Sequence, residues 1–332
     1  MRRFFTLIIF FLAVAVVVTS LGELEKSVET LKRANLWILL LAVLTELLWM
    51  YNSALSYQSL YKVMGLQDKA LRLLPVAISA DFINIVAPSG GVGGAAVFIE
   101  DGRRQGHPSG RVLIAAMLRV LFDYAAFLVV LSLGIIVLIR RNDLDMGKVI
   151  ASLIMLAIAL GLGTLMYLGS RSAEALEGFL FKIIRFINNF LRPILRREYL
   201  SRERAHEFAA EVAEGMAALR GKRKELIIPS LFSLNSKALL ICVLLLVFLA
   251  FSVPFSAGTI IGGFSIGYLF LVVSPTPSGI GIVEGILPVA FRSLRVNWEN
   301  AVIITLAYRF ITFWIPFGIG AAAFRWLQSQ RL

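Results

Sequence analysis

The sequence predicts an all-α integral membrane protein with about six full transmembrane helices and two oppositely oriented re-entrant hairpins. Hydrophobic residues make up 58% of its 332 residues. Several apolar runs reach the roughly 20 residues that a helix needs to cross the hydrocarbon core of a bilayer. Two other apolar stretches are interrupted by proline and glycine, and broken backbone is tolerated at membrane depth only inside protein or beside a water-filled cavity. We therefore expect residues 1–332 to form a single polytopic membrane domain.

The composition also argues against several classes of function. The net charge is +12, but the basic residues cluster beside apolar runs, where anionic lipid headgroups are the nearest partners, so we expect no nucleic-acid partner. The one cysteine, Cys242, excludes an intrachain disulfide and a cysteine-based metal cluster. The two histidines, His107 and His206, are 99 residues apart, and we expect no metal site and no cofactor.

The predicted full spans lie on the apolar runs. Arg2 and Arg3 precede the first run, Phe4–Leu21, as in a signal peptide, but no good cleavage site follows, so we expect an uncleaved first helix. The other full spans are expected at residues 36–56, 112–139, 149–168, 227–251 and 301–324. Basic residues beside the first and last spans predict cytoplasmic N- and C-termini in the cell (inner) membrane.

Two apolar stretches have arms that are too short to cross the bilayer. In the first, Leu73–Val86 and Val92–Ile99 flank the turn Pro88–Gly94, and basic residues on both sides favour entry from the cytoplasm. In the second, Gly258–Val273 and Gly281–Phe291 flank a turn that contains two prolines. These stretches are the two predicted re-entrant hairpins.

The two interrupted stretches are similar to each other. Pro88-Ser89-Gly90-Gly91-Val92-Gly93 aligns with Pro277-Ser278-Gly279-Ile280-Gly281, and an arginine follows each proline by 31 or 32 residues, at Arg119 and Arg309. Three full spans lie between the copies, an odd number, so the copies point in opposite directions, as in many secondary transporters. The sequence thus predicts an inverted repeat of residues about 36–139 and about 227–325. Chance similarity between two common Pro-Ser-Gly turns is the alternative.

A basic insertion, residues 171–224, lies between the repeats. Apolar residues recur at helical spacing from Leu176 to Ile194, which predicts an amphipathic helix in the headgroup plane. A more polar helix is expected over about residues 201–219. We expect residues 171–224 to bind the anionic membrane surface; a solvated linker is the alternative.

Residues around both turns resemble the lysylphosphatidylglycerol synthase transmembrane region family of flippase-like proteins. The family's second motif, Pro-x-Pro-Gly-Gly-x-Gly-x-x-Glu, is similar to Pro275-Thr-Pro277-Ser278-Gly279-Ile-Gly281-Ile-Val-Glu284, with Tyr308-Arg309 in the span that follows. Its first motif is similar to Pro88–Gly94 with Arg103-Arg104, Arg119 and Asp123. The resemblance covers nearly the whole chain and implies lipid translocation or lipid-linked envelope assembly.

The sequence departs from the family's pattern in three places. Ser278 replaces a glycine, which we expect to be tolerated. Gly94 stands where many relatives carry a glutamate, so a second intramembrane carboxylate must come from Asp81, from Glu100 or from neither. The sequence ends at Leu332 without the soluble acyltransferase domain of aminoacylating relatives, so the resemblance implies no aminoacyl transfer by this chain.

The candidate substrate site combines the two turns with charged residues of the following spans. Its residues are Pro88, Ser89, Gly90, Gly91, Gly93, Arg119, Asp123, Pro277, Ser278, Gly279, Gly281, Glu284 and Arg309. Arginine suits a lipid phosphate because its planar fork makes bidentate bonds and stays charged. The helix N-terminus beside Glu284 can also offer backbone N–H groups to a phosphate. An unpaired arginine in the membrane costs about 2.5–3.5 kcal/mol even on lenient scales, so each arginine must have a partner or water.

The alternative is that these charges form structural ion pairs. Arg119 would then pair with Asp123, Arg309 with Glu284, and Glu46 with Lys237, to hold the repeats together. The sequence alone leaves both readings open.

We expect a flippase-like protein that translocates an anionic phospholipid or a lipid-linked precursor, and a transporter rather than an enzyme. One alternative is a lipid-modifying membrane enzyme, or the membrane subunit of one, with Glu284 or Asp123 as general base. Another is a membrane scaffold that recruits a soluble partner through residues 171–224. The sequence has no nucleotide-binding lysine loop, so we do not expect an ATP-driven pump. A homodimer is left open.

Overall fold

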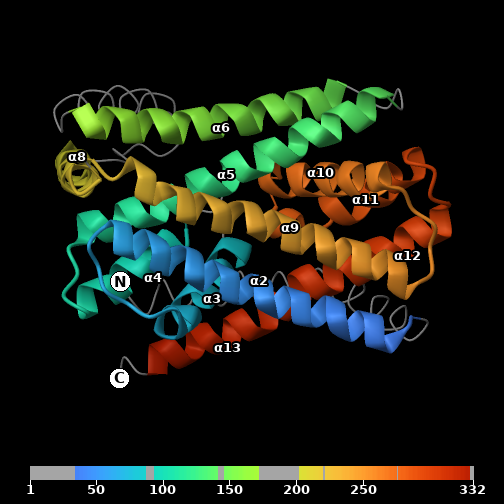
Figure 1. Ribbon diagram of the computed structural model, residues 1–332, viewed down its shortest axis with the longest axis horizontal. Coiled ribbons are helices and arrows are strands. Elements are labelled where there is room, and N and C mark those ends of the chain that lie inside the picture. Colours follow the sequence, from blue (N-terminus) through green and yellow to red (C-terminus); the bar gives the residue numbers. More distant parts are fainter. Residues whose placement is uncertain are drawn as a thin grey trace, which may run out of the picture.

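The computed structural model describes residues 34–86, 93–140, 146–171, 202–219, 221–274 and 276–329. These residues form helices joined by turns and loops, with no strand among them, and the helices pack into an elongated bundle (Figure 1). The predicted first span, Phe4–Leu21, the turn residues Pro88–Gly91 and the predicted amphipathic helix Leu176–Ile194 lie outside the described residues. The described part of the chain is all-α, as predicted.

Four helical runs are long and apolar enough to cross a membrane by length and composition, and each covers a predicted full span. They are Leu36–Val63 (α2), Ser109–Arg140 (α5), Lys224–Ala250, which contains α9 (Ile227–Ala250), and Trp298–Ser329. The last run is made of α12 (Trp298–Arg309), the π-helical turn η3 (Phe310–Trp314) and α13 (Ile315–Ser329). The predicted span at residues 149–168 is also helical, within α6 (Met146–Arg171).

Local sequence explains where these helices begin and end. Asn35 caps α2, because its side-chain oxygen accepts the backbone N–H of Trp37 at 3.1 Å. Asn297 caps α12 in the same way, through the N–H of Asn300 at 2.8 Å. The helix α2 continues past its predicted end at residue 56 because Leu60 and other apolar residues of its last turns are buried in the core.

Two pairs of shorter helices occupy the positions of the predicted hairpins. In one pair, α3 (Ala70–Val86) packs on α4 (Ala95–Arg104). In the other, α10 (Ala257–Val273) packs on α11 (Ile282–Ser293), and a single 3-10 turn, η2 (Pro277–Gly279), lies between them. Figure 1 shows the two pairs in opposite halves of the bundle along its long axis.

The two halves interlock through the long helices. The helix α2 packs along α9, α5 packs on α10, and α13 packs on α3. Small residues bring two of these contacts close together: Gly134 of α5 faces Ser265 of α10, and Gly320 of α13 faces Phe82 of α3. The Ser265 hydroxyl also donates to the backbone carbonyl of Val130 at 3.3 Å. Each hairpin is therefore covered by the long helix that follows the other hairpin.

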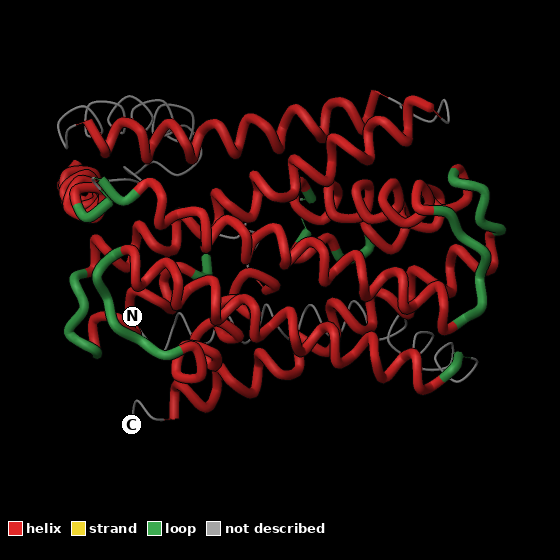
Figure 2. The backbone as a smooth tube through the Cα atoms, viewed as in Figure 1, coloured by secondary structure: helices red, strands yellow, loops and turns green. Residues whose placement is uncertain are grey.

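Two main clusters of buried apolar side chains hold the bundle together. One cluster joins α3, α4 and the first half of α5, and the other joins α9, α10, α11 and α12. The helix α2 contributes to both, through residues such as Ala42 and Leu60. Figure 2 shows that most connecting loops gather at the two ends of the bundle, while short loop segments lie inside it beside the broken helices.

The described part of the basic insertion docks on the bundle. Its helix α8 (Arg202–Ala217) confirms the polar helix expected there and packs on α5 and α6. Gly215 lies against Gly110 at the start of α5, and Val212 is fully buried. After the short 3-10 helix η1 (Arg223–Leu226) the chain enters α9. Just before η1, the Lys222 ammonium donates to the backbone carbonyl of Val63 at 2.7 Å, at the end of α2.

Candidate functional site

The second turn has a backbone that ordinary residues adopt only under constraint. Ser278 has φ of 46°, and Gly279 and Gly281 have φ of 71° and 77°, all in the left-handed region. Glycine adopts this region freely, but a serine there is strained by about 1–2 kcal/mol. Side chains stabilise the turn from within: the Thr276 hydroxyl donates to the carbonyl of Ile280 at 3.0 Å.

A buried ion pair closes this turn. The Arg309 guanidinium donates through Nε to Glu284 Oε1, and through Nη2 to the backbone carbonyl of Ser278 at 3.1 Å. The other oxygen, Glu284 Oε2, accepts the backbone N–H of Gly281 at 2.8 Å. The side chains of Arg309 and Glu284 are only 4% and 10% exposed. The predicted Arg309–Glu284 pair is therefore confirmed, and Glu284 also accepts the N–H of Gly281, the N-cap residue of α11.

The helix that carries Arg309 is irregular directly after it. The π-helical turn η3 begins at Phe310, and π-helical turns leave extra backbone freedom and are frequent at functional sites. The ring of Phe313 lies 4.7 Å from the Arg309 guanidinium carbon, in a cation–π contact. Pro288 in α11 has no backbone N–H, so the carbonyl of Glu284 lacks its helical partner. Both chain segments around the ion pair thus depart from regular helix.

Two glycines near the ion pair have open space where a side chain would be. A Cβ added at Gly281 or at Gly285 would meet no atom within 4 Å, and both glycines are exposed. Glu284 lies between these two glycines in the sequence, at the start of α11. The backbone is therefore uncovered at these two glycines, on either side of Glu284 in the sequence.

The first turn is built differently. The backbone N–H of Gly94 donates to the side-chain oxygen of Asn84 at 2.7 Å, so a neutral amide stands where the second turn uses Glu284. A Cβ at Gly94 would lie 2.8 Å from the carbonyl oxygen of Ala80, which leaves no room for the glutamate that many relatives carry. Of the two other candidates for the second carboxylate, Glu100 is on the surface with Arg104, and Asp81 is partly buried, with its Oδ2 atom buried.

The second turn lies against the first hairpin. The turn η2 packs on α3, and Ile280 contacts the apolar cluster that contains Ala80 and Ile83. Pro88, Ser89, Gly90 and Gly91 lie outside the described residues, so the predicted approach of the two turns is supported on the α3 side alone. Gly93 is the one candidate glycine of the first turn that the structure describes.

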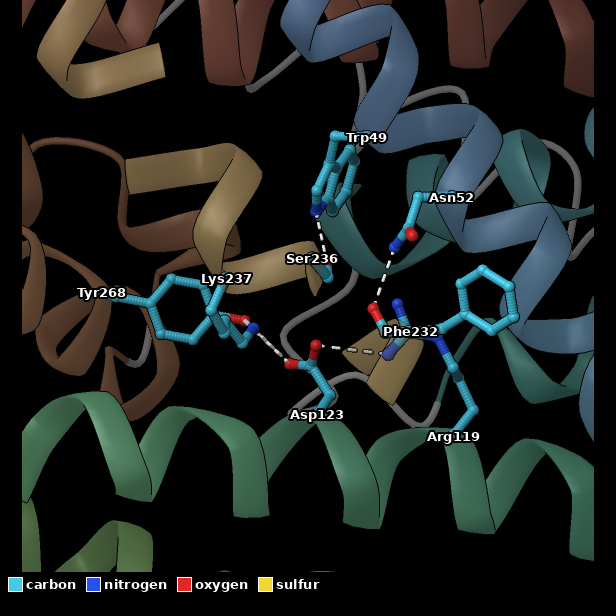
Figure 3. Close-up of polar contacts among 8 residues, drawn as sticks. All are labelled: Trp49, Asn52, Arg119, Asp123, Phe232, Ser236, Lys237 and Tyr268. Carbon is cyan, nitrogen blue, oxygen red and sulfur yellow. Dashed lines mark hydrogen bonds and ion pairs between the residues drawn. The ribbon is translucent and has the colours of Figure 1, made fainter. Parts of the chain in front are cut away.

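A second charged cluster surrounds Asp123 on α5 (Figure 3). Asp123 Oδ1 pairs with Arg119 at 3.2 Å, which confirms the predicted pair, and Oδ2 pairs with Lys237 of α9 at 2.7 Å. The phenol of Tyr268, on α10, donates to the same Oδ2 at 2.9 Å. The Lys237 ammonium also lies 3.9 Å from the centre of the Tyr268 ring. Three helices are therefore tied together by one carboxylate that has three partners.

Polar bonds continue along the contact of α2 and α9 beside this cluster (Figure 3). The indole N–H of Trp49 donates to the Ser236 hydroxyl at 2.6 Å. The amide of Asn52 donates to the backbone carbonyl of Phe232 at 3.0 Å. These bonds fix α9, and with it Lys237, against α2.

The expected Glu46–Lys237 pair is wrong. Lys237 bonds Asp123 and Tyr268 instead, because it projects toward α5 and α10. Glu46 is 0% exposed, and neither of its oxygens has a hydrogen-bond partner within the described residues. An oxygen of Asp81 on α3, Oδ2, is buried without a partner as well. The structure therefore leaves both oxygens of Glu46 and one oxygen of Asp81 buried without a partner within the described residues.

Nearly the whole chain resembles one family of membrane proteins. The sequence profile of the lysylphosphatidylglycerol synthase TM region matches residues 4–320. The chain belongs to this family. It is also 24% identical, over 327 residues, to a UPF0104 membrane protein of Methanothermobacter thermautotrophicus, and the match covers 96% of this chain and 93% of that protein. With its apolar helices, this member of the lysylphosphatidylglycerol synthase TM region family is a multi-pass membrane protein.

The structure separates the predicted residues of this family member into two groups. Ser278, Gly281, Glu284 and Arg309 meet at the second turn, with Pro277 and Gly279 in the same 3-10 turn, whereas Arg119 and Asp123 belong to the neighbouring cluster. Sequence reasoning missed Tyr268 and Phe313. Both lie in apolar runs where aromatic residues are common, so no local signal marks them.

Proposed function

We propose that the protein translocates an anionic phospholipid or a lipid-linked precursor by binding its phosphate at Arg309. The observation that carries this proposal is the arrangement at the second turn. There a buried arginine meets a broken helix and its only carboxylate partner among the described residues, Glu284. Transporters of several folds place broken helices around the substrate site in this way.

An exchange of anions gives this geometry a mechanism. Arg309 stays charged inside the protein, so it needs an anion in every state. Glu284 supplies the anion in the structure described here, and a lipid phosphate can replace it with two parallel N–H···O bonds. Glu284 would keep its bond to the N–H of Gly281 and turn toward the open side near Gly285. Arg309 would thus keep an anionic partner while the headgroup enters and leaves the site.

Two oppositely directed copies of one unit would let the site face each side of the membrane in turn. We infer that residues 36–139 and 227–325 are these copies. The supporting observations are the opposite placement of the two hairpins and the reciprocal packing of α5 on α10 and of α13 on α3 (Figure 1). Rocking of one unit against the other would then open the turn alternately to each leaflet.

The distribution of basic residues supports one orientation. Lys62, Arg103 and Arg104, with the described end of the insertion at Lys222 and Lys224, lie at the ends of helices that meet on one side of the bundle (Figure 1). The positive-inside rule places this side in the cytoplasm of a cell-membrane protein. Residues 171–224 would then lie against the anionic inner leaflet.

The geometry gives less support to a lipid-modifying enzyme. A general base needs a free lone pair for the proton that it removes. Asp123 already accepts bonds from three side chains, and Glu284 from Arg309 and the N–H of Gly281. Both carboxylates therefore have hydrogen-bond donors on each of their two oxygens.

Reconstitution into liposomes tests the proposal. We expect the wild-type protein to move a fluorescent anionic phospholipid between leaflets faster than protein-free liposomes do. Arg309→Ala should reduce the rate to that of protein-free liposomes, because the phosphate loses its partner. Arg292→Ala is the matched control, since Arg292 is an exposed arginine at the other end of α11.

Two outcomes would contradict the proposal. One is wild-type movement no faster than in empty liposomes, and the other is full activity of Arg309→Ala. Mass spectrometry of the lipids after the assay separates the remaining alternative, because an enzyme would leave a new lipid product. Folding of each variant is checked by gel filtration before reconstitution.

A further inference from the structure

The interior contains a pair of carboxyl groups that the exchange at Arg309 does not use. Glu46 of α2 is fully buried and both of its oxygens lack partners within the described residues. Asp81 of α3 has one such oxygen, and α3 packs against α2. A buried carboxylate without partners costs free energy, so a membrane protein keeps one where it has a function.

The position of Glu46 along α2 places it inside the hydrocarbon core. It is the eleventh of the 28 residues of α2, about 15 Å from the start of the helix at 1.5 Å per residue. The helix is about 42 Å long and the core about 30 Å thick, so a helix that crosses the core holds Glu46 within it. Lys237 is likewise the eleventh residue of α9.

In the second half of the molecule, the residues at the corresponding helix positions bind a carboxylate. The helices α3 and α10 both have 17 residues, and Asp81 and Tyr268 are the twelfth residue of each. Lys237 and Tyr268 together hold the carboxylate of Asp123. In the first half, two acids occupy the positions of the lysine and the tyrosine. A pair that binds an anion in one half is therefore replaced by a pair suited to a positive charge in the other.

The residue that corresponds to the anion Asp123 is also different in the second half of the molecule. Asp123 lies four residues after Arg119, and Phe313 lies four residues after Arg309. Phe313 cannot accept or donate a proton, and its ring contacts Arg309 instead. Phe313 thus occupies the position that corresponds to Asp123, and it offers no cation to Glu46 and Asp81.

The charges around the two acids do not balance. Among the described residues, the charged or titratable groups near Glu46 include Asp81 and Tyr308, and those near Asp81 include Tyr57, Arg119 and Asp123. Arg119 and Lys237 are both bonded to Asp123. Three carboxyl groups therefore share two cations, and one positive charge is lacking.

We propose that Glu46 and Asp81 form a proton-binding site inside the membrane domain. A proton supplies the missing charge without the shell of oxygen ligands that a metal cation needs. With the proton bound, α2 and α3 carry one fewer negative charge between them; without it, two like charges face each other in a medium of low dielectric constant. Release of the proton would push the first hairpin away from α2. That this movement drives lipid translocation rests on the proposed function.

Infrared difference spectroscopy of the full-length protein in nanodiscs tests the site directly. Spectra recorded between acidic and alkaline buffer should contain the C=O band of a buried protonated carboxyl group in the wild type. The band should be lost in Glu46→Gln and lost or shifted in Asp81→Asn. It should persist in the matched control Glu299→Gln, because Glu299 is an exposed acid in the first turn of α12. A band that is absent from the wild type, or unchanged in both variants, overturns the proposal.

A salt titration separates the proton from an alkali cation. The melting temperature is measured in alkaline buffer with sodium chloride or choline chloride at equal ionic strength. Equal effects of the two salts are expected, whereas stabilisation by sodium that disappears in Glu46→Gln would overturn the proton in favour of a sodium ion. These readouts need no lipid movement. Absence of the band from the wild type, with Arg309-dependent translocation intact, would refute the proton site alone. A band that depends on Glu46, without any translocation, would refute the proposed function alone.

Discussion

Asp123 and Glu46 are both carboxyl groups on membrane-spanning helices, but the protein surrounds them in opposite ways. Asp123 is held by two cations and a phenol from three helices. Glu46 has no hydrogen-bond partner within the described residues, and its helix α2 packs against α3, which carries another acid, Asp81. A carboxylate with three partners is part of the scaffold, since its loss would leave buried cations behind. A buried carboxyl group without partners weakens the scaffold and is kept for what it binds.

The two turns also differ in whether a charged or a neutral side chain closes them. The second turn is closed by an ion pair between Glu284 and Arg309, and the first by a neutral bond from Gly94 to Asn84. An ion pair can exchange its carboxylate for another anion, whereas a backbone bond to an amide offers no charge for a lipid phosphate to replace. The difference is consistent with our two proposals, that the second turn binds the headgroup and that the first hairpin responds to protons.

The largest difference between the two acids should be seen in stability. We expect Asp123→Ala to lower the free energy of unfolding by about 3–5 kcal/mol, because Lys237 and Arg119 are left buried without an anion. Glu46→Ala should cost less, since no partner is abandoned. Unfolding by denaturant in detergent micelles measures both. Equal losses of unfolding free energy in the two variants would show that the two carboxyl groups contribute alike to stability.

The turns should differ in their tolerance of a side chain. Gly94→Ala should destabilise the protein by about 1–3 kcal/mol, because the new Cβ meets the backbone carbonyl of Ala80, which cannot rotate away. Gly285→Ala is the control in the second hairpin. There the Cβ enters open space within a helix, and the change should be neutral or stabilise by up to about 1 kcal/mol. Melting temperatures of the two variants test the contrast, and a stable Gly94→Ala protein would refute it.

Glu46→Gln should change how stability depends on pH. If the folded protein holds a proton that the unfolded chain releases at neutral pH, the free energy of unfolding falls as the pH rises. The amide cannot release a proton, so the variant should be more stable than the wild type in alkaline buffer, by about 1–3 kcal/mol. Unfolding is measured in acidic and alkaline buffer. Parallel curves for wild type and variant would contradict the expectation.

The smallest expected effect concerns Ser278. Its φ of 46° lies in the left-handed region, where glycine is unstrained. Ser278→Gly, which restores the residue of the family's motif, should stabilise the protein by about 0.5–1 kcal/mol, the strain being partly offset by the greater freedom of glycine in the unfolded chain. A thermal melt detects a change of this size. A lower melting temperature would show that the serine side chain has a role.

The sequence was sufficient for the helices and for pairs that are local or marked by a motif. Apolar run length predicted α2, α5, α9 and the last helical run, and proline and glycine located both hairpins. Arg119 and Asp123 lie four residues apart on one helix, so their pair could be predicted, and the motif pointed to Glu284 and Arg309. The partners of Lys237 could not, because they depend on how α5, α9 and α10 rotate against one another. Packing alone determines which face of a uniformly apolar helix points inward.

The most direct test of the central claim is a lipid at Arg309. Cryo-electron microscopy of the protein in nanodiscs with an anionic phospholipid would show it, in the wild type and in Glu284→Gln, whose neutral amide competes less with a phosphate. We predict headgroup density within hydrogen-bond distance of the Arg309 guanidinium, stronger in Glu284→Gln, with the side chain at position 284 turned away. Arg309 bonded to residue 284 in both proteins, with no headgroup density at the turn, would contradict the account.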